Sequence, residues 1–177
     1  MNLPNKLTVL RIIMTPIFIA AFYLDIQGWN IIAAVIYCFA FITDILDGAI
    51  ARKYNMVTDF GKLVDPIADK ILTVSALIML TANGDVSPIA TIVIISREFL
   101  VSAIRMIALT SNKVVAASNL GKAKTVIQTI TILVVFVAIS IEKINFIAQI
   151  LIWLSVLITV VSGVDYFKKN VKSLTFK

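Results

Sequence analysis

Six long apolar stretches, separated by short polar connections, divide the chain. We place them at residues 7–24, 30–52, 62–82, 87–110, 121–141 and 144–167. Each has close to the ~20 residues that a helix needs to cross the hydrocarbon core of a bilayer. Because the connections are short, we expect consecutive helices to be antiparallel neighbours. The pattern predicts an all-α integral membrane protein, with residues 1–177 forming a single domain built as a six-transmembrane-helix bundle.

The composition supports a lipid environment and narrows the possible chemistry. Of the 177 residues, 60% are hydrophobic and 15% are charged, whereas a soluble domain of this size exposes more charge. Cys38, the single cysteine, cannot form an internal disulfide. The chain has no histidine, which removes the usual general base and zinc ligand. Acid–base or metal chemistry must therefore rest on carboxylates, amines and hydroxyls.

The distribution of lysine and arginine predicts the orientation. The net charge is +6. The connections after the first, third and fifth stretches contain one lysine, Lys143, whereas the ends of the other connections are rich in lysine and arginine. The positive-inside rule then places both termini in the cytoplasm, where basic residues face anionic lipid headgroups. We expect no nucleic-acid partner, because that function needs a soluble basic patch.

Acidic residues concentrate where a membrane helix should have few. Asp44 and Asp47 share a helix face with Gly48 and Ala51, and Arg52 follows. On the next predicted helix, the residues spaced by four on one face are Gly61, Asp65 and Asp69. The connection between the two helices is short enough for them to lie side by side. Four carboxylates would then converge near the cytoplasmic boundary of the membrane.

Buried carboxylates that lie close together stay ionised only when cations neutralise them. An all-carboxylate set favours magnesium, manganese or calcium over zinc. Two such ions could polarise a phosphate, activate an attacking hydroxyl and stabilise a leaving oxygen. The small residues leave room for a bulky ligand, and Arg52 offers a planar fork for a phosphate. The alternatives are ion-paired packing or a cation pathway, which explain the small residues and the arginine less well.

The same segment resembles the signature of the CDP-alcohol phosphatidyltransferase family, D-x2-D-G-x2-A-R-x8-G-x3-D-x3-D. Every fixed position is filled. The resemblance implies a bundle of six helices, typically a homodimer, whose active site faces the cytoplasm. It implies that two divalent ions, magnesium or manganese, are held by Asp44, Asp47, Asp65 and Asp69, and that Asp69 is also the general base. It implies a CDP pocket lined by Gly48, Ala51, Arg52 and Gly61. The implied reaction is attack of an acceptor hydroxyl on CDP-diacylglycerol, with release of CMP.

Further charges in the apolar stretches concern the acceptor. Arg97 and Arg105 lie eight residues apart, within about 80° on a helix, and could reach one pocket beside Glu98. Two or more such cations, with Lys124 and Arg11 as further candidates, could clamp the dianion of a phosphorylated acceptor. The ordinary alternative for Lys124 and the nearby Lys122 is that they extend to the membrane interface as positive flanks.

Three short runs carry a finer resemblance. The runs PNKLTVLR, SREFLVSAIR and GKAKTVIQ are similar to bacterial phosphatidylglycerophosphate synthases within the family. This implies sn-glycerol 3-phosphate as the acceptor and the bacterial cytoplasmic membrane as the location. Another phosphorylated polyol, such as inositol phosphate, is the alternative acceptor. A cation transporter or channel that uses the aspartates as an ion site is the alternative from a different class.

Overall fold

The computed structural model describes residues 3–24, 26–54, 59–110 and 119–170. Within these ranges, the side chains of a few residues are not described. They are those of 3–4, 49, 51–53, 59–63, 65–66, 69, 107–110, 119 and 170.

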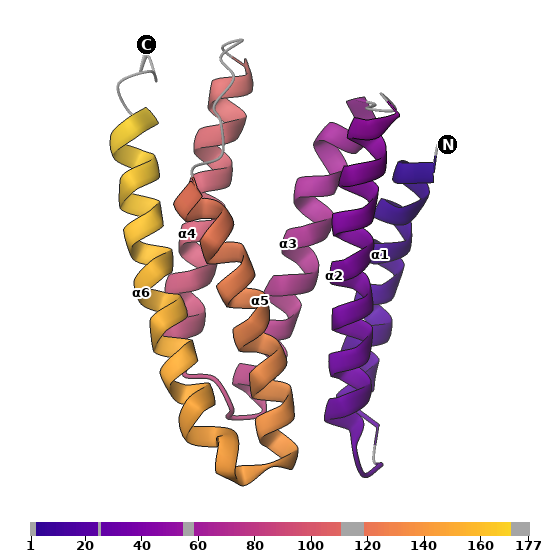
Figure 1. The fold of residues 1–177 in the computed structure, drawn as a ribbon, viewed down its shortest axis with the longest axis vertical. Helices are drawn as coiled ribbons and strands as arrows, with labels where there is room; N and C mark the ends of the chain where they lie inside the picture. Colours follow the sequence, from indigo (N-terminus) through magenta and orange to yellow (C-terminus); the bar gives the residue numbers. More distant parts are fainter. Residues whose placement is uncertain (1–2, 25, 55–58, 111–118, 171–177) are drawn as a thin grey trace.

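Helices make up almost all of the described chain. They are α1 (Leu3–Ala21), α2 (Trp29–Lys53), α3 (Asp59–Ala82), α4 (Pro88–Thr110), α5 (Asn119–Ser140), the short 3₁₀ helix η1 (Glu142–Ile144) and α6 (Asn145–Asn170). The six α-helices run up and down in one bundle, and α1 begins at the same end at which α6 finishes (Figure 1). The prediction of six long helices is confirmed, and their ends fall within a few residues of the predicted limits.

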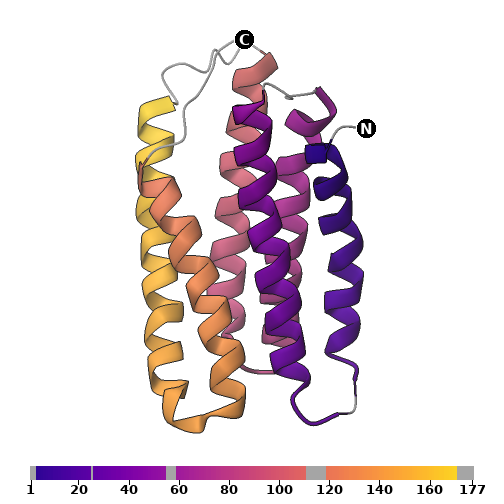
Figure 2. The same ribbon diagram turned by 45° about the vertical axis from the view of Figure 1, so that its right-hand side comes forward.

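The order of the helices around the bundle differs from the order in the chain. Helix α1 packs against α2 and α3, α4 packs against α3 and α6, and α5 packs against α6 and α2 (Figure 2). The expectation that all consecutive helices are neighbours is therefore wrong for α4 and α5, which have few contacts among the described residues. A connection fixes only how far apart two helix ends can be, whereas packing along the whole length decides which helices lie side by side.

Short connections at one end of the bundle join α1 to α2 and α3 to α4. Gly28 precedes α2 with a φ of 86°, and Gly84 follows α3 with a φ of 90°, a left-handed conformation that glycine adopts without strain. The amides of Asp85 and Val86 both donate to the carbonyl of Leu80, which closes the end of α3. These short connections hold the joined ends of α3 and α4, and of α1 and α2, close together.

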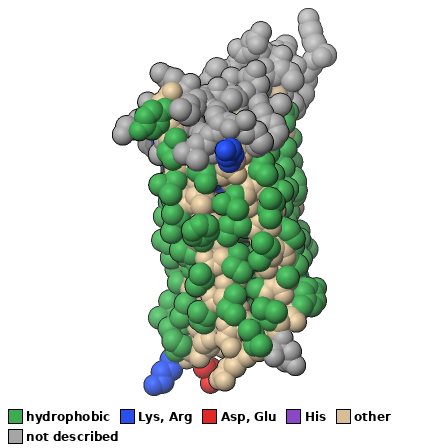
Figure 3. All heavy atoms as spheres, turned by 90° about the vertical axis from the view of Figure 1, so that its right-hand side faces the viewer, with side chains coloured by type: hydrophobic (Ala, Val, Ile, Leu, Met, Phe, Trp, Pro, Cys, Tyr) green, Lys and Arg blue, Asp and Glu red, His purple; other side chains and the backbone are tan. Residues whose placement is uncertain are grey.

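Apolar side chains cover the outside of the bundle, while its interior holds both apolar and polar side chains. One face is mostly apolar along its length (Figure 3). The charged side chains visible on it lie near its two ends. Large exposed side chains on α1 and α2 include Ile13, Ile17, Val35 and Phe39. A surface of this kind is stable when lipid is the solvent. The chain is therefore a multi-pass membrane protein.

Three segments of the described chain are long and apolar enough to cross a membrane. They are Trp29–Gly48, Leu120–Ser140 and Glu142–Lys169. In α4 the apolar sequence is interrupted by Arg97, Glu98 and Arg105, and the described apolar stretch of α3 is the shorter Lys70–Ala82. The prediction that the chain is an integral membrane protein is confirmed by these segments.

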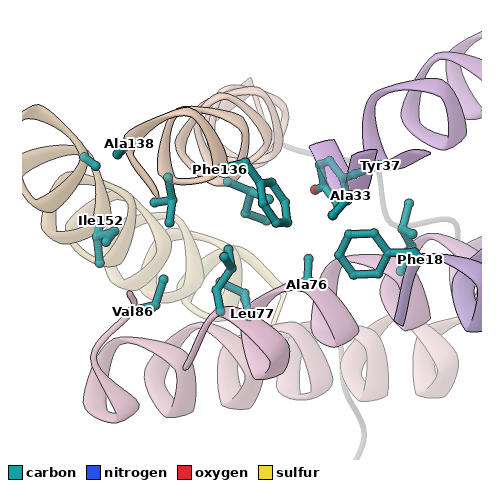
Figure 4. Packing of buried hydrophobic residues seen from close by; sticks show 14 of the residues in the cluster. Phe18, Ala33, Tyr37, Ala76, Leu77, Val86, Phe136, Ala138 and Ile152 are labelled. Atoms are coloured by element: carbon teal, nitrogen blue, oxygen red, sulfur yellow. The ribbon is translucent and has the colours of Figure 1, made fainter. Parts of the chain in front are cut away.

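An aromatic cluster joins α1, α2 and α5 in the half of the bundle away from the termini. The ring of Phe18 lies 6.0 Å from that of Phe136 and 6.1 Å from that of Tyr37 (Figure 4). Nearby, the side-chain amide of Asn30 donates to the carbonyl of Phe136 and to Ser140 Oγ, at 2.8 and 2.7 Å. Aromatic packing and these buried hydrogen bonds hold this half together, while the buried charged side chains, Arg11, Asp47 and Lys124, lie in the other half.

Candidate active site

Helix α1 turns a polar face toward its neighbours. Asn5, Thr8, Arg11 and Thr15 recur every three or four residues, and all four are buried. A helix with this spacing presents them along one side, which packs against α2 and α3. Polar groups on the inner face of a membrane helix need partners, and Arg11 finds them on α2.

Arg11 bridges two of the motif carboxylates. Its side chain is 1% exposed, and its two terminal nitrogens lie 2.6 Å from Asp44 Oδ1 and 2.5 Å from Asp47 Oδ2. Asp44 and Asp47 are one turn apart on α2, so both carboxylates reach the same guanidinium. The prediction that these aspartates share one helix face is confirmed, with Gly48 directly after them.

This arrangement fits the chemistry of a divalent metal site. Two carboxylates already converge on one positive group, and carboxylate oxygen is the ligand that magnesium and manganese prefer. Among the described side chains, no group of three or more possible metal ligands is found. Asp65 and Asp69, the other two predicted ligands, belong to α3, but their side chains lie outside the described set.

The structure describes only some of the residues that were predicted to bind CDP. Gly48 lies in α2 beside Asp47. Ala51 and Arg52 occupy the last turn of α2, and Gly61 lies in the first turn of α3, but the side chains at these positions are outside the described set. The backbone alone therefore places the two halves of the motif on α2 and α3, at the same end of the bundle as the termini (Figure 1).

A cavity rich in cations opens between α3, α4, α5 and α6. It has a volume of about 230 Å³. Its lining, which we call the basic cavity, comprises Lys70, Arg97, Glu98, Val101, Ser102, Arg105, Gly121, Lys122, Thr125 and Tyr166. Among the described lining residues, four are cations and one is a carboxylate, so the cavity favours an anion. The prediction that Arg97 and Arg105 reach a common pocket is confirmed.

Arg97 is held in place from three sides. Its terminal nitrogens donate to Glu98 Oε1 and to Ser162 Oγ, both at 2.9 Å. Glu98 also pairs with Lys124, so one carboxylate serves two cations. On α6, Gly163 leaves space for the arginine stem, because a Cβ there would lie 3.0 Å from Arg97 Cγ. These contacts fix the direction in which the guanidinium points.

The structure separates the four cations that were predicted to hold an acceptor phosphate. Arg97 and Arg105 line the basic cavity. Lys124 pairs with Glu98 and lines a smaller adjoining recess. Arg11 is not part of either lining and instead bridges Asp44 and Asp47. In a medium of low dielectric constant, a guanidinium pairs with the nearest carboxylates, and those of α2 lie beside α1.

Sequence reasoning missed Lys70, Ser162 and Gly163. Lys70 directly follows the last aspartate of the motif, and nothing in the sequence distinguishes it from an ordinary interfacial lysine. Ser162 and Gly163 form a pair of small residues in an otherwise apolar stretch, which is a signal of close helix packing in membranes. That signal indicates close contact but not its partner, Arg97 on α4.

With the site described, comparison with known proteins defines its class. The family model for CDP-alcohol phosphatidyltransferase matches residues 1–161. The chain belongs to this family and is an enzyme of this class. Membership confirms the prediction of an enzyme over that of an ion transporter.

Bacterial relatives cover nearly the whole chain. A Rickettsia bellii protein named CDP-diacylglycerol–glycerol-3-phosphate 3-phosphatidyltransferase is 39% identical over 170 residues, covering 94% of each chain. A Bacillus subtilis protein with the same name is 40% identical over 188 residues, covering 98% of this chain and 97% of the relative. A Mycobacterium tuberculosis protein named probable phosphatidylglycerophosphate synthase is 38% identical, covering 98% of this chain and 83% of the relative.

Proposed function

We propose that the protein transfers the phosphatidyl group of CDP-diacylglycerol to sn-glycerol 3-phosphate, giving phosphatidylglycerophosphate and CMP. The observation that carries the proposal is the basic cavity, whose described lining has four cations and one carboxylate and includes Lys70, next to Asp69 in α3. A neutral acceptor would not need so many cations, whereas a phosphate dianion is bound well by two or more of them. The names of the relatives point to the same acceptor.

The residues have four roles in this reaction. Arg97 and Arg105, with Lys122, hold the acceptor phosphate in the basic cavity. Asp69 accepts the proton of the acceptor hydroxyl, whose oxygen forms a bond to the lipid-linked phosphorus while the bond to CMP breaks. Two divalent ions bound by Asp44, Asp47, Asp65 and Asp69 would supply positive charge for the reacting phosphates. Gly48, Ala51, Arg52 and Gly61 would accommodate the CDP group.

A direct displacement suits this chain better than a covalent intermediate. The sequence has no histidine, and Cys38 belongs to the apolar part of α2. No strong nucleophile with an adjacent base is therefore provided by these residue types. The reaction then needs both substrates bound together, with the acceptor oxygen in line with the departing CMP.

We also propose that all six helices cross the bacterial cytoplasmic membrane, with the aspartate motif facing the cytoplasm. The shortest, α1, has 19 residues, which at ~1.5 Å per residue is about the thickness of the hydrocarbon core. The motif end of the bundle is the end at which lysine and arginine concentrate, in agreement with the positive-inside rule. The homodimer that the family resemblance implies stays a prediction.

The proposed reaction is tested by CMP release from purified protein in detergent. We expect release with CDP-diacylglycerol, magnesium or manganese, and sn-glycerol 3-phosphate, and loss of release with a chelator. Reactions with inositol phosphate, with serine and without an acceptor serve as controls. Release with inositol phosphate in place of sn-glycerol 3-phosphate would keep the enzyme class and overturn the proposed acceptor. Full activity in chelator would overturn the role of the metal ions.

The close contact between Gly163 and Arg97 predicts the effect of a single added methyl group. Changing Gly163 to alanine would force the arginine stem to shift and weaken its bond to Ser162. We expect the KM for sn-glycerol 3-phosphate to rise about 10-fold, the usual effect of losing a hydrogen bond to a charged group. The melting temperature should change little, because the about 1 kcal/mol by which alanine favours a helix over glycine offsets much of the weakened hydrogen bond.

The control for this prediction is the same substitution in an Arg97→Leu background. If Gly163 acts through Arg97, the alanine should add little once the arginine is gone. An equal rise in KM in both backgrounds would show that Gly163 matters for another reason. An unchanged KM in the single variant would show that Arg97 does not position the acceptor.

A further inference from the structure

A small recess lies next to the basic cavity, deeper in the bundle. Its volume is about 20 Å³, and a space of this size holds about one water molecule or one hydroxyl group. The recess shares Lys70, Glu98 and Thr125 with the basic cavity. The recess and the basic cavity are therefore adjacent.

Gln128, on α5, is the unusual residue of this recess. It is 3% exposed, and neither Nε2 nor Oε1 has a hydrogen-bond partner among the described residues. Leaving both ends of an amide buried without a partner is costly. A hydroxyl group satisfies both ends at once, because its O–H donates to Oε1 and its oxygen accepts from Nε2–H.

The position of the recess relates it to the reacting groups. Thr73 lines the recess and lies one turn after Asp69 in α3. The recess is thus next to the basic cavity, and one of its lining residues lies one helical turn from the proposed base, Asp69. An acceptor that extends from the basic cavity toward the turn of α3 after Asp69 would meet the recess that Thr73 and Gln128 line.

We propose that Gln128 binds the non-reacting hydroxyl of the acceptor and makes the enzyme selective for a polyol phosphate over a simple alcohol phosphate. This inference rests on the proposed function, since it concerns the acceptor of that reaction. A site built to bond a hydroxyl rejects an analogue that lacks it, because the buried amide is then left without a partner. Gln128 would be a specificity-determining residue with no part in proton transfer.

The test compares sn-glycerol 3-phosphate with 3-hydroxypropyl phosphate, which lacks the middle hydroxyl. We expect the wild-type kcat/KM to be about 10- to 100-fold lower for the analogue. Gln128→Met has a side chain of similar length without the amide. In this variant, kcat/KM for sn-glycerol 3-phosphate should fall to near the value for the analogue, so that the preference largely disappears.

Ser155→Ala is the matched control. Ser155 Oγ is also buried without a partner among the described residues. It lines a third cavity, which Gln128 also borders but which shares no described lining residue with the basic cavity. The Ser155→Ala variant should keep the wild-type preference for the middle hydroxyl. If Gln128→Met does not fold, Gln128→Asn, which withdraws the amide by one methylene, should show the same loss of preference.

The outcomes separate the two proposals. If the wild type does not use sn-glycerol 3-phosphate, the proposed function fails and this inference with it. If the wild type uses it but shows no preference over the analogue, or if the Gln128 variants keep the full preference, the acceptor stands and the inference is overturned. In that case the recess holds only water.

Discussion

Replacing Asp69 with asparagine is expected to reduce CMP release by at least about 1000-fold while the protein stays folded. Asparagine has nearly the same size, but it cannot accept a proton from the acceptor hydroxyl or give a metal ion an anionic ligand. Loss of a general base alone typically costs about 100- to 10,000-fold, and the weaker metal binding adds to it. The measurement is CMP release with CDP-diacylglycerol and sn-glycerol 3-phosphate, together with thermal unfolding of the same sample.

Asp165→Asn provides the matched control for this prediction. Asp165 lies on α6, and its carboxylate pairs with Lys169 at 2.9 Å in an exposed i,i+4 arrangement. Its neutralisation should leave activity unchanged and stability nearly so, because exposed pairs of this kind contribute little. Near-normal activity in Asp69→Asn would show that Asp69 is not the base. An unfolded Asp69→Asn protein would instead give Asp69 a structural role.

Replacing Arg11 with methionine is expected to make the stability of the protein depend strongly on divalent metal. In the structure, Arg11 neutralises Asp44 and Asp47 from a buried position. Without Arg11 and without metal, the guanidinium no longer compensates the two carboxylates. Removing one partner of a buried ion pair lowers the free energy of unfolding by about 3–5 kcal/mol. Magnesium or manganese bound by the two aspartates should restore much of that loss.

The measurement is thermal unfolding in detergent, first with chelator and then with increasing manganese. We expect a much larger rise in melting temperature with metal for Arg11→Met than for the wild type. Arg105→Met is the control, since Arg105 is in the basic cavity with no ion-pair partner among the described side chains. Its response to metal should match the wild type. Equal metal responses in Arg11→Met and the wild type would show that the ions do not bind at Asp44 and Asp47.

Both predictions concern the aspartate motif. The motif also shows which structural features can be predicted from the local sequence alone. Asp44 and Asp47 share a face of α2 because three residues make nearly one helical turn, a relation that needs no neighbour. For the same reason, Arg97 and Arg105 could be placed on one side of α4. The metal ions and the acceptor, in contrast, were inferred from resemblance and chemistry, and they stay proposals.

The sequence by itself determined the number of helices, their approximate limits and the residues on each helix face, because hydrophobic length and helical periodicity are local properties. The short connection already predicted that α1 lies against α2, but only the tertiary structure decided that Arg11 meets Asp44 and Asp47. It also decided that α6 lies against α4, so that Ser162 and Gly163 hold Arg97. The partner of a buried charge depends on which helices pack together, and that choice is made by side-chain fit along their full length.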